Sequence, residues 1–352
     1  MSSSTVAVLY ALTLSVPSIS TGPEDAKEKK HHVSGGFTNP WDLTWAHFLR
    51  RQINGTANRP DTTPPTVPVR KPEFLPSRET PKLRATWLGH ACYYVEYPSG
   101  LRVLFDPVFE DRCSPISWLG PKRYTEMPCQ IKDIPIIDAV VISHNHYDHL
   151  SYPTVKEISA RHPNCHFFVP LGNEQWFKSS GIDNVTELDW WEERDIVLSP
   201  SQSTGTQVKE SAGNGSSSPG DIKGRVGCLP CQHTSNRGVF DRAKTLWASW
   251  YIESGGRKVY FAGSVPELPD GADDHAPEYD FPSPVHADPH DAVQIFQDTK
   301  CKKALGMHWG TWVLTEEDVL EPPRKLRDAL RKHEIPEDGV FDICDIGESR
   351  EF

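Results

Sequence analysis

Apolar positions along the chain follow two periods, one typical of strands and one typical of helices. Short runs rich in β-branched and aromatic residues predict strands at 84–88, 91–97, 101–105, 137–142, 166–169, 185–188, 225–229, 245–253, 257–262, 303–307 and 341–346. Apolar residues three or four positions apart predict helices at 153–161, 173–180, 288–298 and 323–333. Because strands and helices alternate through most of the chain, the pattern predicts an α/β fold.

The N-terminal part of the chain is less regular. Residues 6–16 are apolar but too few to span a membrane, and they follow no basic residue. We therefore expect 1–32 to be a disordered or targeting segment. Proline is frequent in the following residues, and we expect 33–82 to form an extended arm. A single domain then spans 83–352, with a flexible insertion at 199–223, where Ser, Gly and Thr replace apolar residues.

The composition of the chain favours some classes of binding partner and some cellular compartments over others. The 352 residues carry a formal charge of −11, which disfavours nucleic acid as a partner and means that membrane contact would need a local patch. The eight cysteines show no compact disulfide spacing, which fits a reducing, intracellular compartment. Cys228 and Cys231 form a Cys-x-x-Cys pair without a second half, so we interpret this spacing as a coincidence at a strand end.

The predicted strand at 137–142 is followed by a dense group of metal-binding residue types. They are His144, His146, Asp148 and His149. A loop that leaves the end of a buried strand can direct several side chains into one pocket, and neutral imidazoles with one carboxylate suit Zn²⁺ or a similar divalent ion. The alternative, a histidine-rich surface turn, does not account for so many imidazoles directly after a buried strand. We therefore predict a metal site in this loop.

Further blocks of sequence occur in a characteristic order. They are Thr86-Trp-Leu-Gly-His-Ala, Leu104-Phe-Asp-Pro-Val-Phe, Gly120-Pro-Lys-Arg, Ser143-His-Asn-His-Tyr-Asp-His-Leu, Glu187-Leu-Asp-Trp-Trp-Glu-Glu, His308-Trp-Gly-Thr and Gly347-Glu-Ser-Arg. With these blocks, the chain from about residue 33 to the C-terminus resembles the N-acyl-phosphatidylethanolamine-hydrolysing phospholipase D family of the metallo-β-lactamase superfamily. The resemblance implies an αββα sandwich that holds two metal ions.

The same resemblance implies a role for each candidate site residue. His144, His146 and His233 would hold one Zn²⁺, and Asp148, His149 and His308 would hold the second, with Asp148 and His149 at the catalytic step. Asp106 would support the metal loop from behind, although a simple turn-forming Asp-Pro is the other interpretation. For His233, the position at the end of a predicted strand also favours a ligand over an ordinary buried histidine.

The implied reaction is hydrolysis of a phosphodiester, which converts N-acyl-phosphatidylethanolamine into an N-acylethanolamine and phosphatidate. It implies a phospholipid substrate and peripheral contact with an intracellular membrane. The mitochondrion is one alternative location, and a homodimer is a further expectation. Two other interpretations of the function stay open. One is another hydrolase of this fold, such as a lactonase or a thioesterase, because fold does not fix function. The other is a non-catalytic relative that keeps the ligands without holding both metals.

The chain departs from the family pattern after 257–262. The family continues Phe-Ala-Gly with Asp-Thr-Gly, whose aspartate bridges the two metals, but here Gly263 is followed by Ser264-Val-Pro. A strand and a helix of the family also have no counterpart in the Pro- and Asp-rich residues 267–286. We therefore predict a sandwich that lacks one strand–helix element, a poorly held second metal and impaired hydrolysis. The alternative is a substitute carboxylate from Asp270, Asp273, Asp274 or Asp280.

Overall fold

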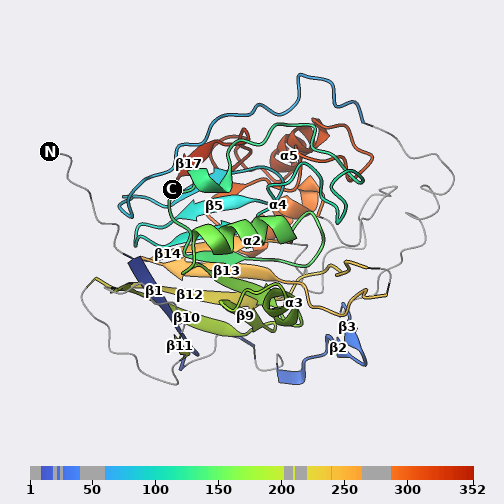
Figure 1. The fold of residues 1–352 in the computed structure, drawn as a ribbon. Helices are drawn as coiled ribbons and strands as arrows, with labels where there is room; N and C mark the ends of the chain where they lie inside the picture. The colour runs from blue at the N-terminus through green and yellow to red at the C-terminus, as the bar shows by residue number, and fades with distance from the viewer. Residues whose placement is uncertain are drawn as a thin grey trace.

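Two packed β-sheets form the centre of the protein (Figure 1). The computed structural model describes residues 9–18, 22–23, 27–39, 60–201, 209–210, 220–238, 240–263 and 287–352. The seven-stranded sheet has the order β17 (Ser349–Glu351), β4 (Arg84–Trp87), β5 (Tyr93–Glu96), β6 (Arg102–Phe105), β7 (Ala139–Val141), β8 (His166–Pro170) and β9 (Val185–Leu188). The six-stranded sheet has the order β11 (Lys209–Glu210), β1 (Leu9–Ser15), β10 (Glu193–Ser201), β12 (Ile222–Leu229), β13 (Ser249–Ser254) and β14 (Arg257–Phe261).

The seven-stranded sheet changes from antiparallel to parallel at β6. Strands β17, β4, β5 and β6 pair antiparallel, whereas β6, β7, β8 and β9 pair parallel. The C-terminal ends of the parallel strands lie at one edge, where ligands bind in open α/β sheets. Asp106 after β6 and Ser143 after β7 therefore come together at this edge, and the Asp106 N–H donates to the Val141 carbonyl at 2.9 Å.

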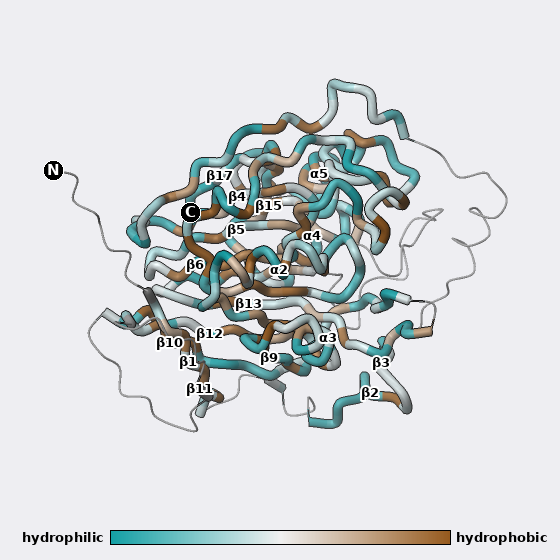
Figure 2. Tube along the Cα trace, viewed as in Figure 1, coloured by the Kyte–Doolittle hydropathy of each residue, from teal (hydrophilic) through white to brown (hydrophobic). Residues whose placement is uncertain are grey.

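The main hydrophobic core lies between the two sheets. Side chains alternate along β6, so Val103 and Phe105 pack in this core and Leu104 packs on the opposite face of the sheet. From the six-stranded sheet, Val226 and Trp250 are completely buried against them. Figure 2 shows apolar residues along the strands and polar residues on the outer loops. The burial of one apolar face from each sheet holds the two sheets together.

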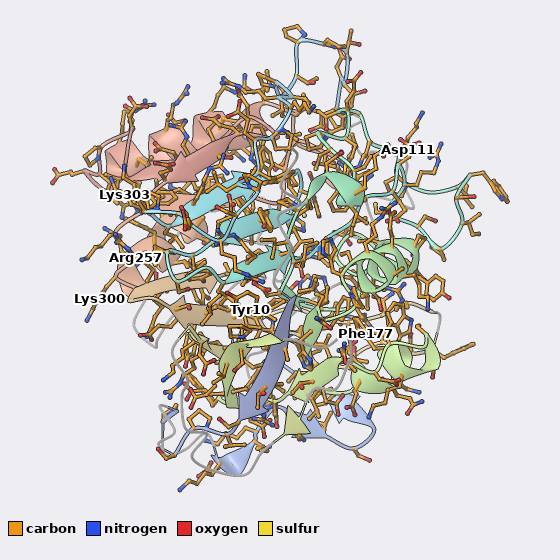
Figure 3. The ribbon with its side chains drawn as sticks, turned by 60° about the vertical axis from the view of Figure 1, so that its left-hand side comes forward. Tyr10, Asp111, Phe177, Arg257, Lys300 and Lys303 are labelled. Atoms are coloured by element: carbon orange, nitrogen blue, oxygen red, sulfur yellow. The ribbon has the colours of Figure 1, made fainter. Side chains whose placement is uncertain are left out.

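Helices pack on the outside of this two-sheet core. Helices α2 (Tyr152–Arg161) and α3 (Glu174–Ser179) cover the seven-stranded sheet with Val155 and Phe177, the latter labelled in Figure 3. The Ser151 side chain caps α2 by accepting the Thr154 N–H. A further cluster joins α4 (Pro289–Asp298) and α5 (Glu321–Lys332) to the parallel pair β15 (Ala304–Leu305) and β16 (Phe341–Asp342). The predicted α/β fold with two packed sheets is confirmed.

The N-terminal segment differs from the prediction of a disordered or targeting stretch over 1–32. Residues Leu9–Ser15 form β1, which pairs antiparallel with β10 and parallel with β11. The physical reason is an alternation that puts Leu12 and Leu14 into the core between the sheets, where they are 3% and 0% exposed. The backbone of this segment thus gains sheet hydrogen bonds, and its apolar face is buried.

The predicted arm and insertion also contain regular structure. Within the arm at 33–82, β2 (His32–Val33) pairs with β3 (Gly36–Phe37), and Val69 makes a parallel bridge to Ile346. In the insertion at 199–223, β10 extends to Ser201 and β12 begins at Ile222, so both ends belong to the sheet. Residues 202–208 and 211–219 lie outside the described part of the chain, as do 264–286, where we expected a missing strand and helix.

Within the described ranges, no helix combines the length and the apolar character needed to cross a bilayer.

The buried His166 should make stability depend on pH. It lies in β8, is 2% exposed and has Nε2 2.8 Å from Thr186 Oγ1; burial lowers its pKa to about 3. The unfolded chain gains a proton at this residue below about pH 6.5 while the folded chain stays neutral, so stability falls as the pH drops from there towards 3. Between pH 7 and pH 5, the free energy of unfolding should fall by about 2 kcal/mol more than in His166→Gln. Urea unfolding of both proteins with a chelator present measures this, and equal losses would contradict it.

Candidate metal centre

Two groups of metal-binding side chains lie next to each other at the edge where the parallel strands end. The histidine group consists of His144, His146 and His233, and the mixed group consists of His90, Asp148, His149 and His308. Within each group, one ligand atom per residue lies within 4.8 Å of all the others. The rings of His144 and His149 are 4.1 Å apart between centroids and connect the two groups.

Each residue of the two groups follows the end of a strand. The loop after β7 carries His144, His146, Asp148 and His149, while His90 follows β4, His233 follows β12 and His308 follows β15. In the loop, the His149 and Leu150 N–H groups both donate to the His146 carbonyl, at 3.1 and 2.8 Å. This tight turn brings the loop's imidazoles and carboxylate close together. His90 comes from another strand of the same sheet, His233 from the six-stranded sheet that packs on it, and His308 from the turn after β15.

Three ring nitrogens converge in the histidine group. His144 Nε2 lies 2.9 Å from His146 Nδ1 and 2.8 Å from His233 Nε2. The other ring nitrogens of the first two residues have outer contacts: His146 Nε2 lies 3.0 Å from Asn236 Oδ1, and His144 Nδ1 lies 2.9 Å from Ser143 Oγ. These outer contacts orient the rings so that the inner nitrogens face one another. A divalent cation between the rings would accept lone pairs from all three inner nitrogens.

Asp148 lies at the centre of the mixed group. Its Oδ2 is 2.9 Å from His90 Nε2, 3.2 Å from His149 Nε2 and 3.6 Å from His308 Nε2. The Nε2 atoms of His149 and His308 are themselves 3.1 Å apart. One carboxylate surrounded by imidazole nitrogens is a donor set that suits Zn²⁺ and similar ions. The side chains of both groups therefore fit a bound metal.

Asp106 lies behind the two groups and fixes their rings. Its Oδ1 accepts the Ser143 N–H at 2.7 Å, and its Oδ2 accepts the Ser143 hydroxyl at 2.5 Å and lies 2.6 Å from His149 Nδ1. Because Nδ1 of His149 is engaged there, its Nε2 is directed into the mixed group. An outer carboxylate commonly orients a metal-binding imidazole in this way. A turn-forming role for Asp106 alone does not account for these contacts.

Three residues of the centre have left-handed backbone conformations. The φ angle is +38° at Asp106, +50° at His90 and +66° at His308. For residues other than glycine, each such conformation costs on the order of 1 kcal/mol, and the surrounding structure must hold it. The His308 N–H donates to the His90 carbonyl at 2.9 Å, and the His90 N–H donates to Thr311 Oγ1 at 2.7 Å. The two turns that carry His90 and His308 are therefore fixed to each other.

Burial and neighbouring charge set the protonation of the centre. Burial, together with the neighbouring His149, lowers the pKa of His144 well below its ordinary value, which keeps the imidazole in its metal-binding form. Burial raises the pKa of Asp148, but the charge of His149 and hydrogen bonds from the imidazoles hold it well below its usual range. Burial lowers the pKa of His149, but Asp148 and Asp106 raise it to about 10. A metal in the mixed group would replace the proton on His149.

The structure brings all six predicted ligand residues together and adds one that sequence reasoning missed. His90 is 3% exposed and contacts Asp148 directly. It stands alone in the sequence between Gly89 and Ala91, so no spacing pattern marks it. The available signals were its position after a predicted strand, like that of His233, and its place in the block Thr86-Trp-Leu-Gly-His-Ala.

Comparison with known proteins agrees with this geometry. Residues 101–309 match the family model described as a β-lactamase superfamily domain. The N-acyl-phosphatidylethanolamine-hydrolyzing phospholipase D 1 of Caenorhabditis elegans is 31% identical over 338 residues, which cover 89% of this chain and 87% of that protein. The chain belongs to this phospholipase D family. A second member, the mitochondrial N-acyl-phosphatidylethanolamine-hydrolyzing phospholipase D of Saccharomyces cerevisiae, is 34% identical over 262 residues, or 68% of this chain and 50% of that protein.

Solved structures similar to this phospholipase D family member include a possible metal-dependent hydrolase from Veillonella parvula. It covers 77% of this chain and 100% of its own, at 14% identity and a TM-score of 0.46.

Gly263, the residue directly after the predicted strand at 257–262, lies beside the metal centre. A Cβ atom added to Gly263 would lie 2.6 Å from Ser143 Cβ. Ser143 in turn contacts Asp106 and His144. Gly263 therefore lies next to both metal-binding groups, and one further residue follows it in the sequence before Val265. That residue is Ser264, a hydroxyl side chain at the position where the resemblance described above implies a carboxylate.

Proposed function

We propose that this chain is a metal-dependent phosphodiesterase of the phospholipase D type, which hydrolyses N-acyl-phosphatidylethanolamine to an N-acylethanolamine and phosphatidate. The observation that carries this proposal is the pair of adjacent ligand groups, joined by the 4.1 Å contact between the His144 and His149 rings. A two-metal centre suits an in-line displacement at phosphorus, where charge develops on both the attacking and the leaving oxygen. The names of the two curated relatives support the choice of lipid.

Zn²⁺ is the ion we propose for the two groups, because imidazole and carboxylate donors suit it. When bound, Zn²⁺ supplies Lewis acidity towards the phosphodiester and lowers the pKa of a water molecule. The protein's own contribution is orientation and charge: Asp106 holds the His149 ring through Nδ1, and Asp148 adds a buried negative charge. We assign Asp148 and His149 to the catalytic step because their 3.2 Å contact lies within the mixed group, where the His149 ring also contacts His144 of the histidine group.

Part of the wall of a small pocket beside the mixed group is apolar, and Glu317 and Asp318 also line this pocket. His90 and His308 lie at the pocket, and its wall includes Tyr124, Trp312, Val313 and Leu314. Val313 and Leu314 are each 37% exposed, so the apolar part of this wall is accessible from solvent. In this proposal the acyl part of the substrate contacts the apolar wall while the phosphodiester faces the histidines.

A neighbouring loop supports the proposed peripheral contact with a membrane. Ile116, Trp118 and Leu119 are 38%, 75% and 54% exposed. The loop is fixed next to the pocket, because the Trp312 Nε1–H donates to the Asp111 carbonyl at 3.2 Å. Exposed tryptophan and leucine side chains insert readily into the interfacial region of a bilayer. Such an insertion would bring the pocket to its lipid substrate.

Replacing two of these side chains should weaken membrane binding. In a Trp118→Ser, Leu119→Ser double variant, the partition coefficient into phosphatidylcholine vesicles should fall about tenfold or more, since two large apolar side chains leave the interface. Vesicle co-sedimentation measures this. Val16→Ser is the matched control, because Val16 is 69% exposed on the N-terminal segment, away from this loop. An equal loss in the control, or no loss in the double variant, would contradict the proposed contact.

A substrate panel tests the proposed reaction. The purified chain with Zn²⁺ is given a diacyl N-acyl-phosphatidylethanolamine, a lactone and a thioester, and products are followed by mass spectrometry. We expect N-acylethanolamine and phosphatidate in equal amounts, with their formation stopped by a chelator. Turnover of the lactone or thioester in place of the phospholipid would contradict this function and favour another hydrolase of the same fold. Absence of turnover on all three would favour a non-catalytic relative.

A further inference from the structure

A third group of metal-binding side chains is formed by residues outside the two groups described above. It consists of His31, His32 and Asp189, whose ligand atoms lie within 4.8 Å of one another. His31 Nε2 lies 2.7 Å from Asp189 Oδ1, and His32 Nε2 lies 2.9 Å from Asp189 Oδ2. Both imidazoles thus direct a ring nitrogen at the same carboxylate.

Two segments that are far apart in the sequence build this third group. His31 directly precedes β2, His32 is its first residue, and Asp189 directly follows β9. His31 and Asp189 are 5% and 1% exposed, whereas the His32 side chain is 37% exposed. Trp190 packs on His31 at 4.1 Å between ring centroids, and its N–H donates to Asp189 Oδ1 at 2.8 Å. The carboxylate and one imidazole are therefore held in place, while the second imidazole faces solvent.

A lysine is the further partner of this carboxylate. Lys29 Nζ lies 2.6 Å from Asp189 Oδ2, and the lysine side chain is 45% exposed. Burial raises the pKa of Asp189, but hydrogen bonds from His31, Lys29 and His32 lower it below its ordinary value. The carboxylate is thus charged and surrounded by groups that complement its charge. Lysine is a flexible point charge that can move into solvent, whereas a divalent ion could also accept lone pairs from both imidazoles.

We propose that His31, His32 and Asp189 form a third metal site, for Zn²⁺ or a similar divalent ion, in which the ion displaces Lys29. Two imidazole nitrogens and one carboxylate oxygen are donors that Zn²⁺ prefers. The exposed edge of His32 allows the ion to enter and lets water complete its coordination. The site contains none of the residues assigned above to lipid hydrolysis.

The third site would stabilise the segment that holds His233 of the histidine group. From His31 the chain runs through β2 and β3 to Asn39, and the Thr38 N–H donates back to the His31 carbonyl at 2.9 Å. The Asn39 Nδ2–H donates to the His233 carbonyl at 2.8 Å, and Asn39 Oδ1 accepts the His233 N–H at 3.1 Å. A metal bound at one end of this short segment therefore restrains the backbone of His233 at its other end.

Metal content of the full-length chain tests the third site separately from the other two. A His144→Ala, Asp148→Asn double variant removes one ligand from each of the first two groups. After equilibration with Zn²⁺ and gel filtration, we expect it to keep about one equivalent per chain, and we expect His32→Ala added to it to abolish this equivalent. Elemental analysis by mass spectrometry gives both values. A double variant without zinc, or zinc that persists after His32→Ala and after Asp189→Asn, would overturn the proposal.

Lys29→Ala distinguishes a metal site from an ion-pair cluster. If the ion displaces the lysine, removal of the amine should tighten Co²⁺ binding by the double variant about tenfold, as followed by visible absorption. Unchanged or weaker Co²⁺ binding would overturn the proposal. Lys30→Ala is the matched control, because Lys30 Nζ contacts Glu28 at 3.0 Å instead of Asp189, and it should leave the Co²⁺ affinity unchanged. These experiments measure metal binding and not turnover, so their outcome does not depend on whether the proposed lipid hydrolysis is correct.

Discussion

Asp148→Asn is expected to remove metal from the mixed group and to lower lipid hydrolysis about a thousandfold or more. Asp148 supplies the carboxylate of that group, and its Oδ2 lies 2.9 Å from His90 and 3.2 Å from His149. The amide of asparagine has a similar shape but no charge, so it should bind a divalent ion far more weakly. The fold should survive, because Asp148 lies in the loop after β7, outside the residues that form the core between the sheets.

Three measurements on one preparation check this expectation: zinc per chain, turnover of N-acyl-phosphatidylethanolamine and the melting temperature without metal. His333→Ala serves as the control, because His333 follows α5, belongs to none of the three metal-binding groups and should leave all three values unchanged. His144→Ala should behave like Asp148→Asn through loss of metal from the histidine group. Full metal content and turnover in either variant would show that the loop after β7 is not the reaction centre.

The loop after β7 could be predicted from the sequence because its information is local. The loop places four metal-binding residues close together, directly after a run rich in β-branched residues; they are His144, His146, Asp148 and His149. His90 could not be predicted in the same way, since its contribution depends on a left-handed turn that points it at Asp148. Side chains that meet through packing of distant strands leave no periodic signal in the sequence.

The fold shows the same distinction between local and long-range information. Strands such as β6, β7 and β8 lie within a residue or two of the predicted runs because each is a short, nearly continuous apolar segment. Strand β1 was missed although Leu12 and Leu14 alternate with less apolar residues. Its partner β10 lies far along the chain at Glu193–Ser201, within a region that we interpreted in part as an insertion. Such long-range pairing depends on how all the strands of the two sheets pack together, so the composition of either segment alone does not predict it.

The largest departure from the family pattern leads to an expectation about metal stoichiometry. Two divalent ions at the roughly 4 Å spacing of two-metal sites repel each other by on the order of 15 kcal/mol at an effective dielectric constant of 20. The resemblance described above implies an aspartate after Phe-Ala-Gly that would offset part of this repulsion, whereas this chain has Ser264 there. We therefore expect the histidine and mixed groups together to hold nearer one metal than two, with weak lipid hydrolysis. Zinc per chain is measured in a His32→Ala variant, because this substitution excludes metal bound at the proposed third site.

Insertion of Asp-Thr-Gly after Gly263 should raise that metal content by up to one equivalent. The inserted aspartate would follow a residue that packs against Ser143, which itself contacts Asp106 and His144. Insertion of Asn-Thr-Gly is the matched control, since it adds the same length without the charge and should leave the metal content unchanged. Turnover should rise only in part, because the strand and helix that the family has after this position would also shape the pocket. Two tightly bound metals and rapid hydrolysis in the chain without the insertion would instead point to a substitute carboxylate within 267–286, such as Asp270 or Asp280.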